Sequence, residues 1–197
     1  MHTIGCYIDK ILFKFPITKG IWLKRRIGRI GIHSKIKNPE LITEPDRIYV
    51  GDRTIILPHS RIQSFGYRSG IDNKIVIGNG CYCGFHLSIL AGADIIIHDN
   101  VLIASYVLIS SENHEIDPRS SIPYMEQELR CFPVEIGEGT WIGEKVSIMP
   151  GVTVGKKCVI GANAVVTHSI PDYSMAVGSP ARIIKRYDFD KGEWIKA

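Results

Sequence analysis

His114 is the residue of this chain best suited to acid–base chemistry. It is the only imidazole in the segment 110–133, and Glu112, Asn113 and Asp117 stand beside it. An imidazole has an unperturbed pKa of about 6.5, so it can take a proton from an attacking hydroxyl near neutral pH. The other ring nitrogen needs an acceptor to fix the tautomer. Glu112 is a candidate, and a backbone carbonyl would serve equally.

A six-residue repeat flanks this segment and must position it. From Ile136 onward every sixth residue is a branched aliphatic, and the residue two places earlier is small or aliphatic. Neither an ordinary helix nor an ordinary strand has this period, whereas a short strand facing a core and followed by a turn does. The rows are Ile136, Ile142, Ile148, Val154, Ile160 and Val166 after the break, and Ile77, Cys83, Ile89, Ile97, Ile103 and Ile109 before it, with a fainter start at Val50, Ile56 and Ile62.

The repeat predicts a parallel β-helix, because hexads that cannot bury their apolar row alone must stack on their neighbours. Three hexads make a triangular coil of about eighteen residues, and coils stack at about 4.7–4.9 Å. We expect about two coils before Ser110 and two after Pro133. Segment 110–133 is then a long insertion, and long insertions in compact domains are usually functional.

Length and composition indicate one domain over 197 residues, 45% of them hydrophobic, without an 18-residue apolar run. Cys81, Cys83 and Cys158 fall on core rows, which predicts buried thiols in a reducing compartment. No cleavable signal peptide is evident, so the cytoplasm is the expected location. The expected parts are an N-terminal segment and cap (1–47), a first β-helix part (48–109), an extruded loop (110–133), a second β-helix part (134–170) and a tail (171–197).

The N-terminal segment is basic and amphipathic. Lys19 to Lys37 holds seven basic residues and no acidic one, and Trp22 is among its apolar residues. The segment either packs across the open end of the β-helix or contacts anionic lipid at the inner membrane surface or a lipid-linked substrate. The net charge is only +4, and no aromatic-basic motif occurs, so we expect no nucleic-acid partner.

Three features together resemble the hexapeptide-repeat acyltransferases, above all the maltose, galactoside and nodulation-type O-acetyltransferases and the envelope-polysaccharide O-acetyltransferases. These features are the hexads, the Asn113-His114-x-x-Asp117 loop and the run from Ile136-Gly-Glu-Gly to Val177-Gly-Ser-Pro-Ala-Arg182. The likeness spans 48–186. It implies an all-β, left-handed parallel β-helix with an extruded catalytic loop, a short C-terminal helix and homotrimers with active sites between subunits. The hand of the helix does not follow from the repeat period.

The resemblance also implies a donor site for acetyl-CoA, used as a co-substrate. His114 matches the catalytic histidine, and Gly143 matches the position nearest the thioester, where a backbone N–H should face the oxyanion. Small residues are also common at coil turns, whereas a cation is well suited to a phosphate. The implied contacts are Gly143, Ala162 and Thr167 for the pantetheine arm, Pro180 for the adenine, and Arg182 and Lys185 for the phosphates.

The implied acceptor site departs from the family pattern. The asparagine and aspartate that touch the sugar in the galactoside and maltose enzymes are replaced here by Gly84 and Gly92. A simple galactoside or maltose is therefore not expected. The implied acceptor contacts are Tyr82, Glu112, Asn113 and Trp141, with His86 or the Tyr124-Met125-Glu126 loop as further candidates and His86 equally consistent with a coil-turn residue.

The sequence predicts an acetyl-CoA-dependent O-acetyltransferase acting on a sugar hydroxyl of an envelope polysaccharide or its precursor. N-acetylation of an amino sugar or xenobiotic and a non-catalytic scaffold are the alternatives. The γ-type carbonic anhydrases share the repeat but cluster histidines on zinc, and no such pair occurs here, so no metal is expected. Direct transfer is favoured because no cysteine adjoins His114 in sequence, although Cys131 could approach it in space.

Overall fold

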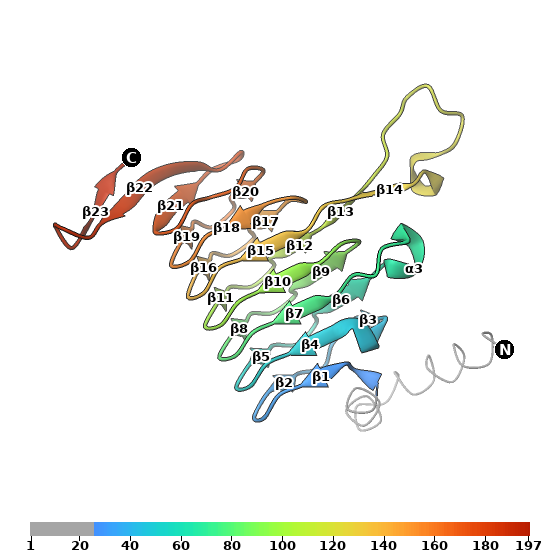
Figure 1. Ribbon diagram of the computed structural model, residues 1–197, viewed down its shortest axis with the longest axis horizontal. Helices are drawn as coiled ribbons and strands as arrows, with labels where there is room; N and C mark the ends of the chain where they lie inside the picture. The colour runs from blue at the N-terminus through green and yellow to red at the C-terminus, as the bar shows by residue number, and fades with distance from the viewer. Residues whose placement is uncertain (1–25) are drawn as a thin grey trace.

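The computed structural model describes residues 26–197, which form a triangular stack of parallel coils (Figure 1). Successive strands pair in parallel and in register, so that Ile95 has Ile75 on one side and Val134 on the other. Each complete coil contributes one strand to each of three sheets, here called sheets A, B and C. The chain therefore advances by one strand spacing per coil, as the hexads predict.

The strands are short, and most belong to the three sheets. Sheet A contains β1 (Arg29–Ile30), β4 (Ile48–Val50), β7 (Ile75–Ile77), β10 (Ile95–Ile97), β15 (Val134–Ile136) and β18 (Thr153–Val154). Sheet B contains β2 (Lys35–Ile36), β5 (Ile55–Ile56), β8 (Tyr82–Cys83), β11 (Leu102–Ile103), β16 (Trp141–Ile142), β19 (Val159–Ile160), β21 (Ser174–Val177), β22 (Arg182–Asp188) and β23 (Glu193–Lys196). Sheet C contains β3 (Leu41–Thr43), β6 (Arg61–Ser64), β9 (Ser88–Ala91), β12 (Leu108–Ser110), β17 (Ser147–Ile148) and β20 (Val165–Val166).

The aliphatic hexad residues fill the inside of the triangle. Ile136, Ile142 and Ile148, one from each sheet of a single coil, are all 0% exposed. Cys83 lies on the same rows, and burial raises the pKa of its thiol. The four cysteines of the described residues are free thiols. The predicted core rows and the buried cysteines at 81, 83 and 158 are confirmed.

The C-terminal end differs from the expected short helix. β22 pairs antiparallel with β21, and β23 pairs antiparallel with β22, so a hairpin extends sheet B (Figure 1). Aromatic and β-branched side chains such as Tyr187 and Trp194 favour strands, and Gly192, at φ +69°, lies in the connecting turn. A helix there would also leave the edge of β21 unpaired.

The β-helix begins earlier and ends later than the expected boundaries at 48 and 170. β1 pairs with β4, and β2 with β5, so residues 29–43 form a coil of the β-helix. At the other end β21 pairs in parallel with β19. In the first coil Ile30, Ile36 and Ile42 already follow the six-residue period, and a two-residue offset around Pro45–Arg47 separates them from Val50. In the last coil the buried row continues with Ile170 and Ala176. Residues 1–25 of the predicted N-terminal cap lie outside the described residues. No helix between residues 26 and 197 is long and apolar enough to cross a membrane.

Candidate active site

His114 stands on a two-stranded antiparallel ribbon that leaves the end of sheet C. The ribbon consists of β13 (Glu112–His114) and β14 (Leu129–Cys131), with His114 opposite Leu129. Beyond the strands, the N–H of Glu115 donates to the Glu128 carbonyl at 2.8 Å. Figure 1 shows the chain between the two strands projecting away from the coils. The predicted extruded loop is therefore present, and its base is hydrogen-bonded.

The His114 imidazole is partly buried. Its Nδ1 is buried and has no hydrogen-bond partner within residues 26–197. Glu112 lies two residues earlier on the same face of the ribbon, but it makes no hydrogen bond to the ring. Within residues 26–197, neither Glu112 nor a backbone carbonyl, the two candidate acceptors, is bonded to Nδ1. A buried ring nitrogen without a partner is costly, so His114 is the candidate functional residue of the insertion.

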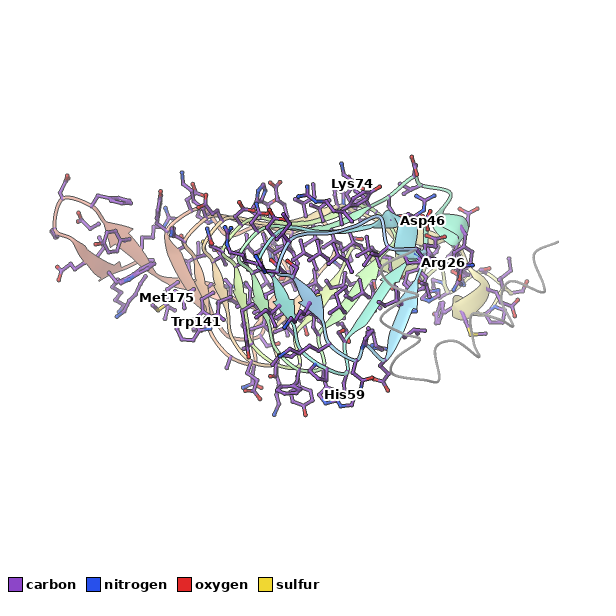
Figure 2. All side chains as sticks on the ribbon, turned by 90° about the horizontal axis from the view of Figure 1, so that it is seen from below. Arg26, Asp46, His59, Lys74, Trp141 and Met175 are labelled. Carbon is purple, nitrogen blue, oxygen red and sulfur yellow. The ribbon has the colours of Figure 1, made fainter. Side chains whose placement is uncertain are left out.

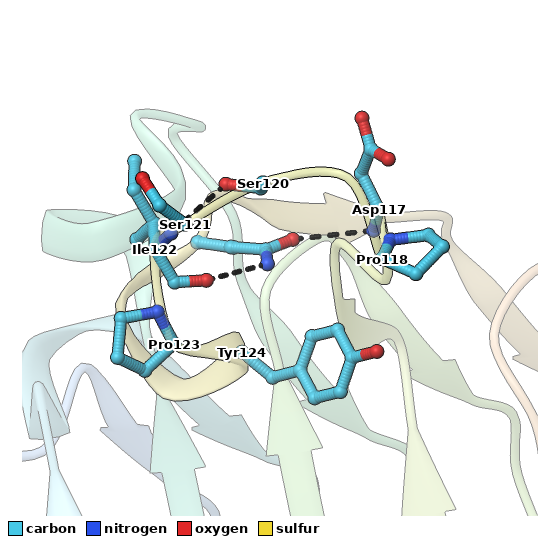
Figure 3. A pocket seen from close by; sticks show the side chains of 8 residues that line it. Asp117, Pro118, Ser120, Ser121, Ile122, Pro123 and Tyr124 are labelled. Carbon is cyan, nitrogen blue, oxygen red and sulfur yellow. Dashed lines mark hydrogen bonds between the residues drawn. The ribbon is translucent and has the colours of Figure 1, made fainter.

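A glutamine shapes the tip of the insertion. Gln127 is buried; its Oε1 accepts the N–H of Asp117 at 3.3 Å, and its Nε2 donates to the Ile122 carbonyl at 2.8 Å (Figure 3). The guanidinium of Arg119 donates two hydrogen bonds of 2.9 Å to the carboxylate of Asp117, and these bonds lower the pKa of that carboxyl. Sequence reasoning missed Gln127, because a lone glutamine in a loop carries no pattern. Asp117, Ile122 and Gln127 are among the residues that line an open cavity of about 220 Å³ (Figure 3).

The predicted Tyr124-Met125-Glu126 segment forms a short 3-10 turn, η2 (Tyr124–Glu126), on this tip. All three residues are exposed. A short helix, α3 (Gly66–Ser69), lies beside the insertion, and its Arg68 donates to the Met125 carbonyl. A second short turn, η1 (Pro45–Arg47), precedes β4. The tip is thus tied to the coils at a point remote in sequence.

Tyr82 and Trp141 lie on the outer face of sheet B, with Leu102 between them in register. Tyr82 is 43% exposed and Trp141 51% exposed. Figure 2 shows Trp141 and Met175 close to each other on one outer side of the coil stack. Tyr82 and Trp141, both predicted acceptor contacts, therefore lie on the same face. The ribbon that carries His114, Glu112 and Asn113 lies on a different side of the triangle.

Gly143 is buried, and its N–H donates to the carbonyl of Ile160 at 2.8 Å. That N–H cannot also stabilise an oxyanion, so the expectation placed on Gly143 needs correction. A side chain at Gly143 is excluded by packing, because a Cβ there would lie 2.7 Å from the Ala162 nitrogen. The next residue, Glu144, is exposed, and its N–H has no acceptor in the described part of the chain. Gly143 and Ala162 do lie together, at the corner between sheets B and C.

Thr167 does not join them. It follows β20, at the corner where the chain leaves sheet C, and its Oγ1 lies 2.9 Å from Nδ1 of His168. His114 also follows a strand of sheet C, namely β12. The predicted pantetheine contacts therefore fall on two edges of one chain, with Thr167 on the edge from which the ribbon projects.

The turn before β22 rests on the last strand of sheet C. Val165 donates its N–H to the Gly178 carbonyl at 3.0 Å, and Ala181 donates to the Val165 carbonyl at 2.8 Å. Pro180, in this turn, is exposed and follows a cis peptide bond. Arg182 pairs with Val177, and Lys185 pairs with Met175, so both cations lie on the outer face of sheet B.

The corner between sheets B and C explains one departure on the acceptor side, Gly84, and places one further candidate, His86. A Cβ on Gly84 would lie 2.6 Å from backbone atoms of Ala104 and Ser105, so no side chain fits there. His86 has φ 56° and is stacked between the rings of His59 and Tyr106, at 4.9 and 4.7 Å. His86 is thus a coil-turn residue within an aromatic stack. Among residues 26–197 no cluster of three or more potential metal ligands occurs.

A parallel β-helix with a histidine-bearing insertion defines the class of protein, and comparisons with known proteins agree. The model of the bacterial transferase hexapeptide family (six repeats) matches residues 133–168. A Schizosaccharomyces pombe protein named "Putative acetyltransferase" is 30% identical over 93% of this chain and 82% of its own length. The chain therefore belongs to the hexapeptide-repeat acyltransferases, and the predicted left-handed β-helix fold is confirmed.

Two further relatives bear on chemistry. The crystal structure of a galactoside acetyltransferase in complex with coenzyme A matches with a TM-score of 0.65 and 26% identity, over 96% of this chain and 84% of that one. The Escherichia coli K12 protein named "Putative lipopolysaccharide biosynthesis O-acetyl transferase WbbJ" is 42% identical over 50% of this chain and 53% of its own. The chain spans 42% to 62% of the length of four curated relatives, WbbJ included.

Proposed function

We propose that this protein transfers an acetyl group from acetyl-CoA to a sugar hydroxyl, with His114 as the general base. The observation that carries the proposal is the single imidazole on the projecting ribbon, with one ring nitrogen buried and unpartnered. The fold around it matches a coenzyme A-bound galactoside acetyltransferase over 96% of the chain. A coenzyme A donor and an imidazole base are the two components that transfer from a thioester to a hydroxyl requires.

The transfer proceeds in one chemical sequence. The acceptor hydroxyl gives its proton to His114 as its oxygen attacks the thioester carbonyl carbon. The C–O bond forms, and the carbonyl oxygen becomes an oxyanion. The tetrahedral intermediate then collapses, the C–S bond breaks, and the leaving thiolate takes the proton back from the imidazolium. Positioned acid–base catalysis of this kind contributes about 10²–10⁴-fold.

The oxyanion needs a preorganised N–H donor. The N–H of Gly143 is already committed to Ile160, so we assign this role to Glu144, whose N–H is free at the same turn. Removal of one such donor typically costs about 10²–10³ in kcat. The exposed position of Glu144 suits a donor that a substrate must reach.

A site shared between subunits of a homotrimer accounts for the scattered residues. In one chain His114 projects from the end of sheet C, whereas Trp141 faces out from sheet B. A rotation axis lets the ribbon of one subunit reach the sheet B face of the next. The unpartnered Nδ1 of His114 would then meet groups of the neighbouring subunit.

The acceptor we propose is a sugar unit of an envelope polysaccharide or its precursor. Tyr82 and Trp141 present exposed aromatic surface for the apolar face of a sugar ring. Gly84 stands where the galactoside and maltose enzymes have a sugar-contacting side chain, and no Cβ fits there, which argues against a simple galactoside as acceptor. The likeness to WbbJ supports the same acceptor class.

Thiol release from acetyl-CoA tests this function, across a panel of mono-, di- and nucleotide-linked sugars and their amino analogues. We expect acceptor-dependent release by the wild type and a loss of about 10²-fold or more in His114→Ala, with acetyl-CoA affinity unchanged. His33→Asn is the control, because His33 is exposed, lies outside the insertion and has a left-handed backbone (φ 61°) that asparagine tolerates. Turnover only with amines would replace the hydroxyl acceptor by an amino sugar, and no binding of acetyl-CoA would refute the enzyme assignment.

A further inference from the structure

The outer face of sheet B carries one continuous row of registered side chains. Each residue of the row is directly paired with the next across neighbouring strands, from β8 to β23. The row changes character along its length: it is apolar in the middle and ends in two cations. Its members are Tyr82, Leu102, Trp141, Val159, Met175, Lys185 and Lys196.

The two cations at the end of the row face each other without a counterion. Lys185 and Lys196 are directly opposite in the antiparallel pair β22–β23, and both are exposed. Like charges in this arrangement are destabilising. No carboxylate within residues 26–197 forms an ion pair with either lysine, and Arg182, on the same face, also has none.

A second pair of like charges lies next to the turn of the same hairpin, and this pair has a counterion. Asp188 and Glu193 are also directly opposite each other. There Lys191 supplies the missing charge, with its Nζ 3.8 Å from Asp188 Oδ2. Within the described residues, one ammonium group thus offsets part of the charge of the acidic pair, whereas the basic pair has no counterion and is left for an external anion.

We infer that Lys196, together with Lys185, binds the 3′-phosphate of the acyl-CoA donor. This rests on the proposed function. Four strand spacings separate Trp141 from Lys196, roughly 19 Å, and an extended acyl-CoA likewise has its thioester at one end and its 3′-phosphate at the other. A terminal phosphate carries about −1.5 to −2 charges at pH 7, which matches two ammonium groups better than the single charge on each phosphate of the internal diphosphate does.

Calorimetric titration with acetyl-CoA and with 3′-dephospho-acetyl-CoA tests this assignment. We expect Lys196→Gln to raise the Kd for acetyl-CoA about three- to tenfold, as for an exposed charge-assisted contact, and to leave the Kd for the dephospho compound unchanged. Lys191→Gln is the matched control, since it makes the same charge change in the same hairpin. Its Kd values should equal those of the wild type.

Thermal unfolding separates binding from structure. Without ligand, Lys196→Gln should melt no lower than the wild type, because the substitution removes a repulsion, while the rise in Tm caused by acetyl-CoA should shrink. Equal Kd values for acetyl-CoA in wild type and Lys196→Gln would overturn the assignment, as would an equal loss for both ligands. A wild type that binds neither ligand would overturn the proposed function as well, which distinguishes the two failures.

Discussion

Gly92 and Cys131 lie so close that a Cβ on Gly92 would be 2.4 Å from the cysteine sulfur. The same Cβ would lie 2.7 Å from the Cβ of Glu112. Gly92 belongs to the turn after β9, and the other two residues face each other across the base of the ribbon that carries His114. A glycine at 92 is therefore what lets the ribbon leave the coils at this angle.

Gly92→Ala should move the ribbon. We expect the substitution to lower the stability by about 1–3 kcal/mol, as overpacking usually does, and to reduce kcat while the Kd for acetyl-CoA stays the same. Thermal unfolding and steady-state kinetics measure the two effects. Adding Cys131→Ala removes the sulfur and should restore part of the loss. Wild-type stability and kcat in Gly92→Ala would show that the ribbon base tolerates a side chain.

Thr140 links its own turn to the turn between β18 and β19 in the next coil, from inside the stack. Its hydroxyl donates to the Gly155 carbonyl at 2.7 Å and accepts the N–H of Cys158 at 3.0 Å. Thr140→Val keeps the shape and leaves both backbone groups without this partner, so we expect a loss of about 2–4 kcal/mol. Chemical unfolding measures it. Thr140→Ser retains the hydroxyl and should lose less than half as much; equal losses would assign the effect to the methyl group instead.

Cys131 should not act as a nucleophile. Burial and the nearby charge of Glu112 raise the pKa of its thiol above the ordinary value of 9.0. A raised pKa means less thiolate at any given pH, so at pH 7–8 the group stays protonated and unreactive. Alkylation at Cys131, followed by mass spectrometry, should be slower than that of a free thiol at pH 8 and should accelerate only as the pH rises past 9.

Activity gives the second readout for the same thiol. Cys131→Ala should keep kcat within about twofold of the wild type, because direct transfer needs no covalent intermediate. An acetylated Cys131 trapped by rapid acid quench, together with a large loss of kcat in the alanine variant, would establish a two-step mechanism in its place.

A shared active site predicts complementation between inactive subunits. His114→Ala removes the base, and the double variant Trp141→Ala/Arg182→Ala removes groups on the opposite face. Co-refolding the two in equal amounts should restore about a quarter of the wild-type activity, since each interface needs one intact partner of each kind. Mixtures that stay inactive, in a protein shown to be trimeric by light scattering, would place the whole site within one chain.

The hexad rows made the coils predictable. A branched aliphatic at every sixth position, as at Ile136, Ile142 and Ile148, has only one way to leave water, which is to face the inside of a stacked triangle. The insertion was equally visible, because a break in so regular a repeat must leave the stack. His114 followed as the imidazole of that insertion, although the resemblance to a family was needed to name its role.

The chain's own residue types, with their six-residue period, determined the core, the coil path and the place of the projecting ribbon. Only the tertiary structure showed that the Gly143 N–H donates to the Ile160 carbonyl, that the C-terminal residues form a hairpin, and that Lys185 lies opposite Lys196. The reason is physical. Burial constrains every inward residue to be apolar and so leaves a periodic mark, whereas outward side chains and backbone donors are free of that constraint, and register between distant strands decides what they meet.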